Sequence, residues 1–423
     1  MSLNKEKTIL FVMPRLPFPM ISGRKTSLYH YCRILSEELG FRLVVAAFLE
    51  AGDDPKLKPD FIDELVVLEK PSKLEKIKNI IFYSFVLSKY PLQVSLYLSA
   101  SAKRQIFKLV EQEAPAIVIA DMVRCTEYIK DVSAFRIADL DDRISLRYKR
   151  QLENDIDNVN PYGAFLDTLP DCIKKIALFK PLKVAILKKE IKLLNSYETF
   201  IGKKCEKTIF VAKKEANSFN VEIGENKAMA VPIGVDVEYF MPRQICNKQN
   251  IISFLGAMNV AHNEHAAKYF IDRILPLVIK KVPDAKFYVI GGGASDELKS
   301  RKSESVVFTD RVKDVREYLC KSKVFVCPML FGSGIKTKNL EAMAMGIPVV
   351  TTSIGSENID AVDGKEWLIA DTDYEFAEKV ISILINDKLN QRISSAARKF
   401  VLDRFTWDIA KEQFENILNV NGD

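Results

Sequence analysis

A glycine-rich turn followed by two lysines is the part of the sequence best suited to chemistry. Gly332 and Gly334 allow backbone conformations that a side chain would forbid, and apolar residues at helical spacing begin directly after them, at about Lys336. The first amide groups of a helix lack partners within it and carry partial positive charge, to which Lys336 and Lys338 add two full charges. This combination predicts an anion site, most simply for a phosphate or diphosphate.

An acidic residue lies one helical turn further along, at Glu341. A carboxylate is a poor ligand for phosphate, but it suits the two hydroxyl groups of a ribose, as acidic residues do in dinucleotide sites. A diphosphate at the turn and a ribose at Glu341 together predict a nucleotide-diphosphate ligand.

The elements around this turn alternate between strands and helices. Residues 324–326 read as a buried strand before the turn, and 349–351 as the strand after its helix. Apolar runs predict further strands at 8–13, 42–48, 64–68, 116–120, 136–139, 208–211, 251–255, 286–290, 306–308 and 367–370. Helical patterns occupy 27–39, 73–88, 102–113, 263–270, 374–385 and 390–418. We therefore expect an α/β protein with parallel sheets, in which 208–211 is the last strand of the first half.

Several motifs of the second half resemble the retaining glycosyltransferase family 4. The central motif is GSGIKTKNLEAMAMGIPVV at 332–350, and the others are VPIGVDVEYF at 231–240, FLGAMNVAHNEHAAKYFIDRILP at 254–276 and VVFTDRV at 306–312. The first half is similar more loosely, through ILFVMPRLPFP and the following Gly23.

The resemblance implies the GT-B fold, with two Rossmann-like domains whose parallel sheets face an interdomain cleft. It places an acceptor-side domain at 1–230 and a nucleotide-sugar donor domain at 231–404, which begins with a linker up to about residue 248. A C-terminal helix at 405–423 would cross back to the first domain. Phe405 and Trp407 would then be structural anchors.

The resemblance also implies the roles of individual residues. Lys336 and Lys338 would stabilise the leaving diphosphate, and the remaining donor contacts would come from Glu341, Ser333, Gly334, Ile335, Gly256, Arg311 and Val312. The sequence departs from the family at two points. Ser333 stands where a sugar-contacting glutamate is common, and the loop GAMNVAHNEHAA lacks the usual arginine and lysine.

The implied reaction is retaining transfer of a sugar from a UDP- or GDP-sugar to a glycan or glycolipid acceptor, in bacterial cell-envelope polysaccharide or glycolipid synthesis. The nucleotide sugar is a co-substrate, and no cofactor or metal is expected. Two alternatives stay open: a sugar-nucleotide epimerase-like enzyme, and a catalytically silent donor-binding subunit, which the Ser333 departure suggests.

Polar residues at strand ends mark a second candidate site in the first half. Asp121 follows the strand at 116–120, and an acidic cluster of Asp139, Asp141 and Asp142 follows the next strand. The carboxyl ends of parallel strands are where ligands bind in open α/β sheets, so we predict a catalytic role for Asp121 and an acceptor-side loop at Gly23 and Arg24. The alternatives are capping aspartates and a solvated basic loop.

Composition excludes several other classes. The 423 residues suit two domains, and a net charge of +6 is too weak to indicate a nucleic-acid partner. The sequence contains no run of about 20 apolar residues, so we predict no membrane-spanning helix. Seven cysteines without CxxC pairs indicate free thiols in a reducing cytoplasm, and three histidines without HxH or HExxH spacing argue against zinc.

Lysines interleave with apolar residues in the segment 145–207. One interpretation is basic amphipathic helices that lie on an anionic membrane, which would place the protein peripherally at the inner face. The other is an ordinary helix pair with its lysines in water, which the proline at position 181 and the lack of tryptophan favour.

Overall fold

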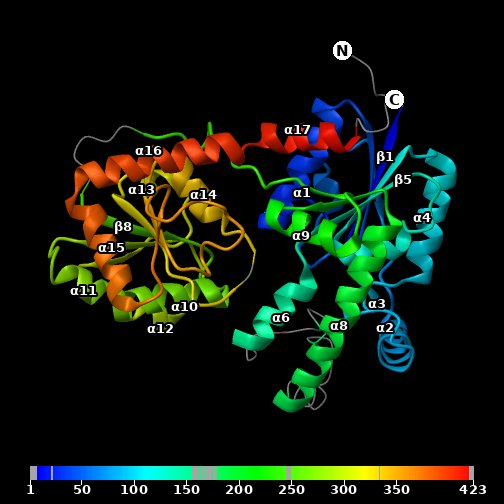
Figure 1. The fold of residues 1–423 in the computed structure, drawn as a ribbon, viewed down its shortest axis with the longest axis horizontal. Coiled ribbons are helices and arrows are strands. Elements are labelled where there is room, and N and C mark those ends of the chain that lie inside the picture. Colours follow the sequence, from blue (N-terminus) through cyan, green and yellow to red (C-terminus); the bar gives the residue numbers. More distant parts are fainter. Residues whose placement is uncertain are drawn as a thin grey trace. The chain divides into compact units, whose positions relative to one another are not determined.

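The protein is described by a computed structural model, which covers residues 7–20, 22–154, 162, 166, 174, 179–243, 249–332 and 334–418. The chain divides into two compact units (Figure 1). Unit 1 comprises Met1–Pro232 together with Asp408–Asp423, and unit 2 comprises Ile233–Trp407.

Unit 1 contains a seven-stranded parallel sheet of order β3-β2-β1-β4-β5-β6-β7. Its strands are β1 (Thr8–Met13), β2 (Arg42–Ala47), β3 (Glu64–Val67), β4 (Ile117–Asp121), β5 (Phe135–Asp141), β6 (Lys207–Phe210) and β7 (Ala228–Ala230). Its longer helices are α1 (Gly23–Arg33), α2 (Lys73–Asn79) with its continuation η3 (Ile80–Val86), α4 (Ala100–Glu113), α6 (Ile144–Asn154), α8 (Lys180–Lys204), α9 (Lys213–Ile223) and α17 (Trp407–Leu418).

Unit 2 contains a six-stranded parallel sheet of order β10-β9-β8-β11-β12-β13. Its strands are β8 (Ile251–Leu255), β9 (Lys286–Ile290), β10 (Val306–Phe308), β11 (Val324–Cys327), β12 (Val349–Thr351) and β13 (Leu368–Ile369). Its main helices are α10 (Ala261–Tyr269), α14 (Thr337–Ala344), α15 (Asp373–Ile385) and α16 (Asp387–Arg404).

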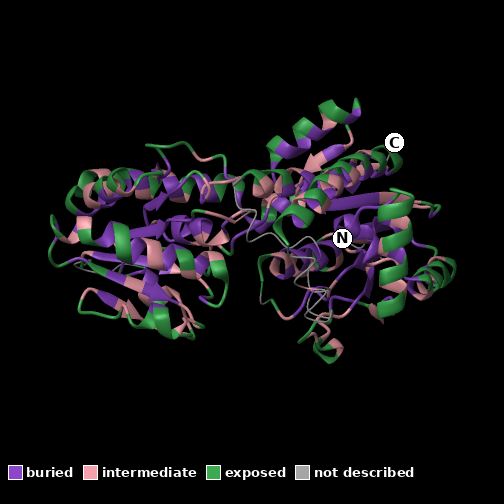
Figure 2. Ribbon diagram, turned by 90° about the horizontal axis from the view of Figure 1, so that it is seen from below, coloured by how far each residue is buried: buried purple, intermediate pink, exposed green. Residues whose placement is uncertain are grey.

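Most strands of both sheets are buried (Figure 2), although β3 at the edge of the first sheet is partly exposed, and this burial explains why they read as continuous apolar runs rather than alternating ones. The predicted bounds of β1, β8, β9, β10 and β12 are confirmed residue for residue. The expectation that 208–211 is the last strand of the first half is wrong, because β7 pairs with β6 beyond it. A three-residue strand of alanine and methionine carries too little β-propensity to be seen in the sequence.

The described part of the lysine-rich segment is helical, and α6 packs with α8 there. Most of the residues from 155 to 178 lie outside the described residues. Among the described helices, none has the length and apolar character that crossing a membrane requires.

The three consecutive glycines at 291–293 form a turn with close backbone approach. Gly291 has a φ of +125°, and a Cβ atom placed there would lie 2.1 Å from the carbonyl oxygen of Gly256. The Met258 amide donates to the Gly292 carbonyl at 2.8 Å, so the loops after β8 and β9 are held against each other.

We expect Gly291→Ala to lower the free energy of unfolding by about 3 kcal/mol, since a strained φ and overpacking each cost roughly 1–3 kcal/mol. Urea denaturation measures the loss. Gly52→Ala is the control, because Gly52 also has a positive φ but no atom within 4 Å of the added methyl group. Equal losses in the two variants would contradict the close contact.

Candidate functional site

The strand order of unit 2 places two loops at one point of the sheet. The order reverses between β8 and β11, so the loop from β8 to α10 and the loop from β11 to α14 flank a topological switch point. Ligands of open α/β sheets bind in the crevice at such a point, outside the carboxyl ends of the strands. The predicted donor residues Gly256, Gly334 and Lys336 lie on these two loops.

Both predicted lysines are directed inward. Lys336 caps the start of α14, is buried to 6% exposure, and its Nζ donates to the Gly334 carbonyl at 2.8 Å. Lys338 Nζ donates to Asn263 Oδ1 at 2.6 Å and lies 4.6 Å from the centre of the Phe254 ring. Lys338 therefore joins the start of α14 to the start of α10.

The pKa of Lys338 is lowered to about 8, mainly by burial and in smaller part by the charge of Lys336, while Cys327 and Glu341 oppose the shift. Two ammonium groups near one helix N-terminus repel each other, and an anion placed between them would relieve that repulsion. This electrostatic arrangement supports the predicted diphosphate site.

Glu341 lies on the same face of α14 as Lys338 and is partly buried. Burial raises its pKa, whereas the charge of Lys338 and a hydrogen bond with the Thr337 side chain lower it. Its carboxylate is thus one helical turn from the lysines, as the sequence predicted.

A second group of predicted donor residues lies on the other side of the β8 loop. A Cβ atom on Gly256 would lie 3.0 Å from Lys338 Nζ, and a Cβ atom on Gly292 would lie 3.3 Å from the Cβ atom of Arg311. Arg311 is exposed and Val312 is partly buried, directly after β10. Ile335 is partly buried in the β11–α14 loop, and Ser333 lies outside the described residues.

His262 is a residue of this site that the sequence reasoning missed. It lies in the first turn of α10, and a Cβ atom on Gly332 would be 3.7 Å from its side chain. Burial, together with the charges of Lys338 and Lys336, lowers its pKa to about 4, so its imidazole is neutral at pH 7. His262 lies at a helix start, and its spacing to the other two histidines gave no signal in the sequence.

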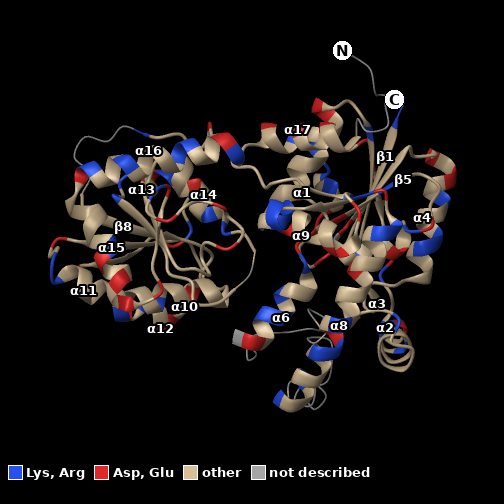
Figure 3. Cartoon of the chain, in the orientation of Figure 1, with Lys and Arg blue, Asp and Glu red and all other residues tan. Residues whose placement is uncertain are grey.

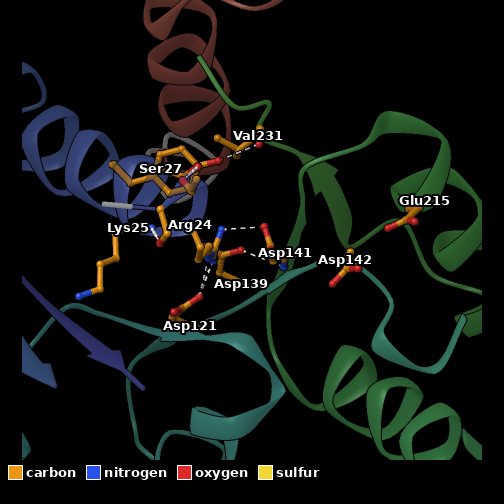
Figure 4. A network of polar contacts seen from close by, with 12 residues as sticks. Arg24, Lys25, Ser27, Asp121, Asp139, Asp141, Asp142, Glu215 and Val231 are labelled. Atoms are coloured by element: carbon orange, nitrogen blue, oxygen red, sulfur yellow. Dashed lines mark hydrogen bonds and ion pairs between the residues drawn. The ribbon is translucent and has the colours of Figure 1, made fainter. Parts of the chain in front are cut away.

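The predicted polar residues of unit 1 come together around one arginine (Figure 4). Arg24, in the first turn of α1, donates from Nε to Asp121 Oδ1 at 3.0 Å, from Nη2 to Asp139 Oδ2 at 2.7 Å and from Nη1 to Asp141 Oδ1 at 3.0 Å. Gly23 precedes it as the first residue of α1. The cluster lies at the switch point between β1 and β4, where the strand order of this sheet reverses.

Three carboxylates around one guanidinium leave the cluster short of positive charge. Burial raises the pKa of Asp139 to about 7 and Arg24 opposes that shift, while the nearby Asp121 and Asp141 add to it. Asp121 is fully buried, and its Oδ2 is without a hydrogen-bond partner. This geometry favours a positioning role for Asp121, which holds Arg24, and its catalytic role stays a prediction.

Asp142, the fourth acidic residue at this strand end, points away from the cluster (Figure 4). It forms an ion pair with Arg147 at 3.2 Å. Among the described residues, no group of three or more His, Cys, Asp or Glu side chains is arranged to hold a metal ion.

Comparison with known proteins places this site within a recognised sequence family. Residues 249–386 match the family model described as Glycosyl transferases group 1. A Klebsiella pneumoniae protein, described as an uncharacterized 44.6 kDa protein in the cps region, is 26% identical over 231 residues, which cover 52% of this chain and 57% of that protein. The GDP-mannose-dependent alpha-(1-6)-phosphatidylinositol monomannoside mannosyltransferase of Mycolicibacterium smegmatis is 25% identical over 234 residues, covering 49% and 60%. The chain thus spans a little over half the length of these relatives.

Solved structures are similar over nearly the whole chain. Sucrose-phosphate synthase from Thermosynechococcus elongatus has a TM-score of 0.65 at 11% identity and covers 98% of both chains. Anabaena HepE, in complex with UDP and glucose, has a TM-score of 0.61 at 13% identity and covers 97% of this chain and 99% of its own. These likenesses confirm the predicted GT-B fold.

We expect Arg24→Met to destabilise unit 1 by about 3–5 kcal/mol at pH 8, because it leaves buried carboxylates without their partner. The loss should be smaller at pH 5.5, since the raised pKa of Asp139 allows that group to become neutral there. Urea denaturation at both pH values measures this. Arg33→Met, which removes a partly exposed arginine of the same helix, should cost under about 1 kcal/mol. A pH-independent loss for Arg24→Met would contradict the assignment.

The lowered pKa of Lys338 predicts how the free energy of unfolding changes with pH. Between pH 8 and its ordinary pKa of 10.5, the unfolded state holds a proton that the folded state has released, so wild-type stability rises with pH relative to Lys338→Met. The difference in unfolding free energy between the two proteins, measured across this range, reports the effect. A difference that does not change with pH would show that Lys338 is solvated rather than buried.

Proposed function

We propose that the protein transfers a glycosyl group from a nucleotide-diphospho-sugar to an acceptor hydroxyl, because residues 249–386 match the model of Glycosyl transferases group 1 and the chain has the GT-B fold. The observation that carries the proposal is the inward placement of Lys336 and Lys338 at the start of α14, with Glu341 one turn away.

The chemistry follows from where charge develops. The bond between the anomeric carbon and the diphosphate oxygen breaks, and a bond from the acceptor oxygen to that carbon forms as the hydroxyl loses its proton. The diphosphate gains negative charge as it departs, and prearranged positive groups that face it can supply several kcal/mol of stabilisation. Lys336, Lys338 and the N-terminus of α14 are such groups, so we propose that they carry this load without a metal ion, and that configuration is retained.

Glu341 would bind the ribose hydroxyls, and Ser333, Gly334 and Ile335 would contact the sugar. The main chain at Arg311 and Val312 would meet the nucleobase, near the loop that contains Gly256. The acceptor would approach from the Gly23–Arg24 side of unit 1. The neutral imidazole of His262, beside Gly332, is able to both donate and accept a hydrogen bond in this site.

The names of similar proteins suggest the substrate class. One relative is encoded in a cps region, another depends on GDP-mannose, and a structural neighbour was solved with UDP and glucose. We therefore propose a UDP- or GDP-sugar as donor, a glycan or glycolipid as acceptor, and a place in bacterial cell-envelope polysaccharide synthesis. Cys32, Cys125, Cys205, Cys320 and Cys327 are buried free thiols, which suit a reducing cytoplasmic compartment.

A thermal-shift screen with UDP, GDP, ADP and TDP identifies the base, and a product assay with the matching nucleotide sugars then tests transfer. We expect Lys336→Ala and Lys338→Ala each to lower kcat about 100-fold or more, by analogy with the loss of one charge-stabilising group. Lys280→Gln, an exposed lysine of unit 2, should leave turnover unchanged. Unchanged transfer by the Lys336 variant would refute the assigned site.

His262 supports one alternative, an epimerase-like reaction, because it adds an ionisable group beside the glycine loop. The same assay separates the candidates. A transferase requires acceptor and releases nucleoside diphosphate, an epimerase converts the nucleotide sugar without acceptor, and a silent subunit shows the thermal shift without turnover.

A further inference from the structure

The helix formed by α2 and η3 presents its apolar side to solvent. The exposed apolar side chains recur at helical spacing along α2 and η3 and continue into the residue after η3. They are between 40% and 80% exposed and comprise Leu74, Ile77, Ile81, Phe82, Phe85, Val86 and Leu87. Its inward side carries Asn79 and Ser84, which are 6% and 2% exposed, together with the partly buried Ile80 and Tyr83. An ordinary surface helix directs its apolar face to the core, whereas here most of the large apolar side chains are exposed.

Hydrogen bonds fix this orientation. Asn79 Nδ2 donates to the carbonyl oxygens of Leu98 at 2.8 Å and Ser95 at 3.3 Å. The Ser84 and Ser95 hydroxyl groups are 2.8 Å apart and hydrogen-bonded. Rotating the helix to bury its apolar side would break these buried bonds, so the exposed stripe is a built feature of the fold.

Positive charge borders the apolar stripe. Lys189 of α8 donates from Nζ to the Phe85 carbonyl at 3.0 Å, and its Nζ lies 5.2 Å from the centre of the Phe85 ring. Both carboxylates of α8, those of Glu190 and Glu198, are 1% exposed, so the charge that α8 presents outward is positive (Figure 3).

A hollow of about 620 Å³ lies between the end of the stripe and α8. It is lined by three lysines and no carboxylate, namely Lys89, Lys189 and Lys192, together with Ser88, Tyr90, Leu193, Ser196, Tyr197 and Phe200. Phe200 is 47% exposed at this site. Lysines and hydroxyl groups beside aromatic rings suit a phosphate group that is joined to an apolar body.

We propose that this stripe and the adjoining hollow form a docking surface for an anionic lipid bilayer. The side chains of α2 and η3 enter the boundary between head groups and acyl chains, and the lysines around the hollow bind lipid phosphates. A second copy of this chain fits less well, because a two-fold interface would set the same lysines against each other. The proposal concerns a surface of unit 1 and stands apart from the donor site.

Sedimentation of the full-length protein with vesicles, without any nucleotide sugar, tests the proposal. Binding should be strong with phosphatidylcholine mixed with phosphatidylglycerol and weak with phosphatidylcholine alone. Phe82→Ser combined with Phe85→Ser should lower the vesicle partition coefficient at least tenfold. Lys189→Gln combined with Lys192→Gln should lower it for anionic vesicles by about fivefold per lysine, given roughly 1 kcal/mol for each.

The matched control is Val221→Ser, which removes an 84% exposed apolar side chain of α9 in the same unit, and it should leave binding unchanged. Equal binding of the Phe82/Phe85 variant and wild type, or no binding to anionic vesicles, would overturn the proposal. The proposal would also be overturned if light scattering showed a dimer that the same substitutions dissociate. A large loss of melting temperature in the variant without vesicles would overturn it as well. In either case the side chains would be packed against protein rather than free to enter a bilayer. Transfer to a water-soluble acceptor tests the proposed function separately.

Discussion

The proposed donor site depends on holding two like charges, those of Lys336 and Lys338, inward at the start of one helix. Burial, more than the charge of Lys336, lowers the pKa of Lys338, so the folded structure disfavours its charged form. Asn263 and Phe254 hold Lys338, and the Gly334 carbonyl holds Lys336. An anionic ligand would relieve this unfavourable burial of positive charge, which is why we propose a diphosphate site there.

Unit 1 uses the opposite balance of charge at the equivalent point of its own sheet. There a single guanidinium, from Arg24, is shared by Asp121, Asp139 and Asp141 at the switch between β1 and β4. These groups hold the start of α1 against the ends of β4 and β5, although Asp121 Oδ2 is left without a hydrogen-bond partner. The two switch points thus hold opposite excesses of charge, two lysines in unit 2 and three aspartates around one arginine in unit 1.

Much of the fold was predictable because buried parallel strands are written as short, continuous apolar runs that end at glycine, proline or aspartate. The apolar run located β1, β8, β9, β10 and β12, although threonine rather than glycine, proline or aspartate follows β10 and β12. It failed at β7, whose Ala228–Ala230 sequence pairs with β6. The motif at 332–350 likewise indicated the donor loop, since glycines before a lysine-bearing helix need no partner elsewhere in the chain to be recognised.

The sequence by itself determined the local elements and the chemistry of the glycine loop, because both depend on residues close together along the chain. Only the tertiary structure decided which distant groups meet. It brought His262 to Gly332, placed Arg24 among three aspartates, and turned the apolar side of α2 and η3 outward through the bonds of Asn79 and Ser84. These outcomes depend on strand order and on hydrogen-bond partners that other elements supply. Helical periodicity in the sequence shows that one face of a helix is apolar, but it does not show whether that face points to the core or to solvent.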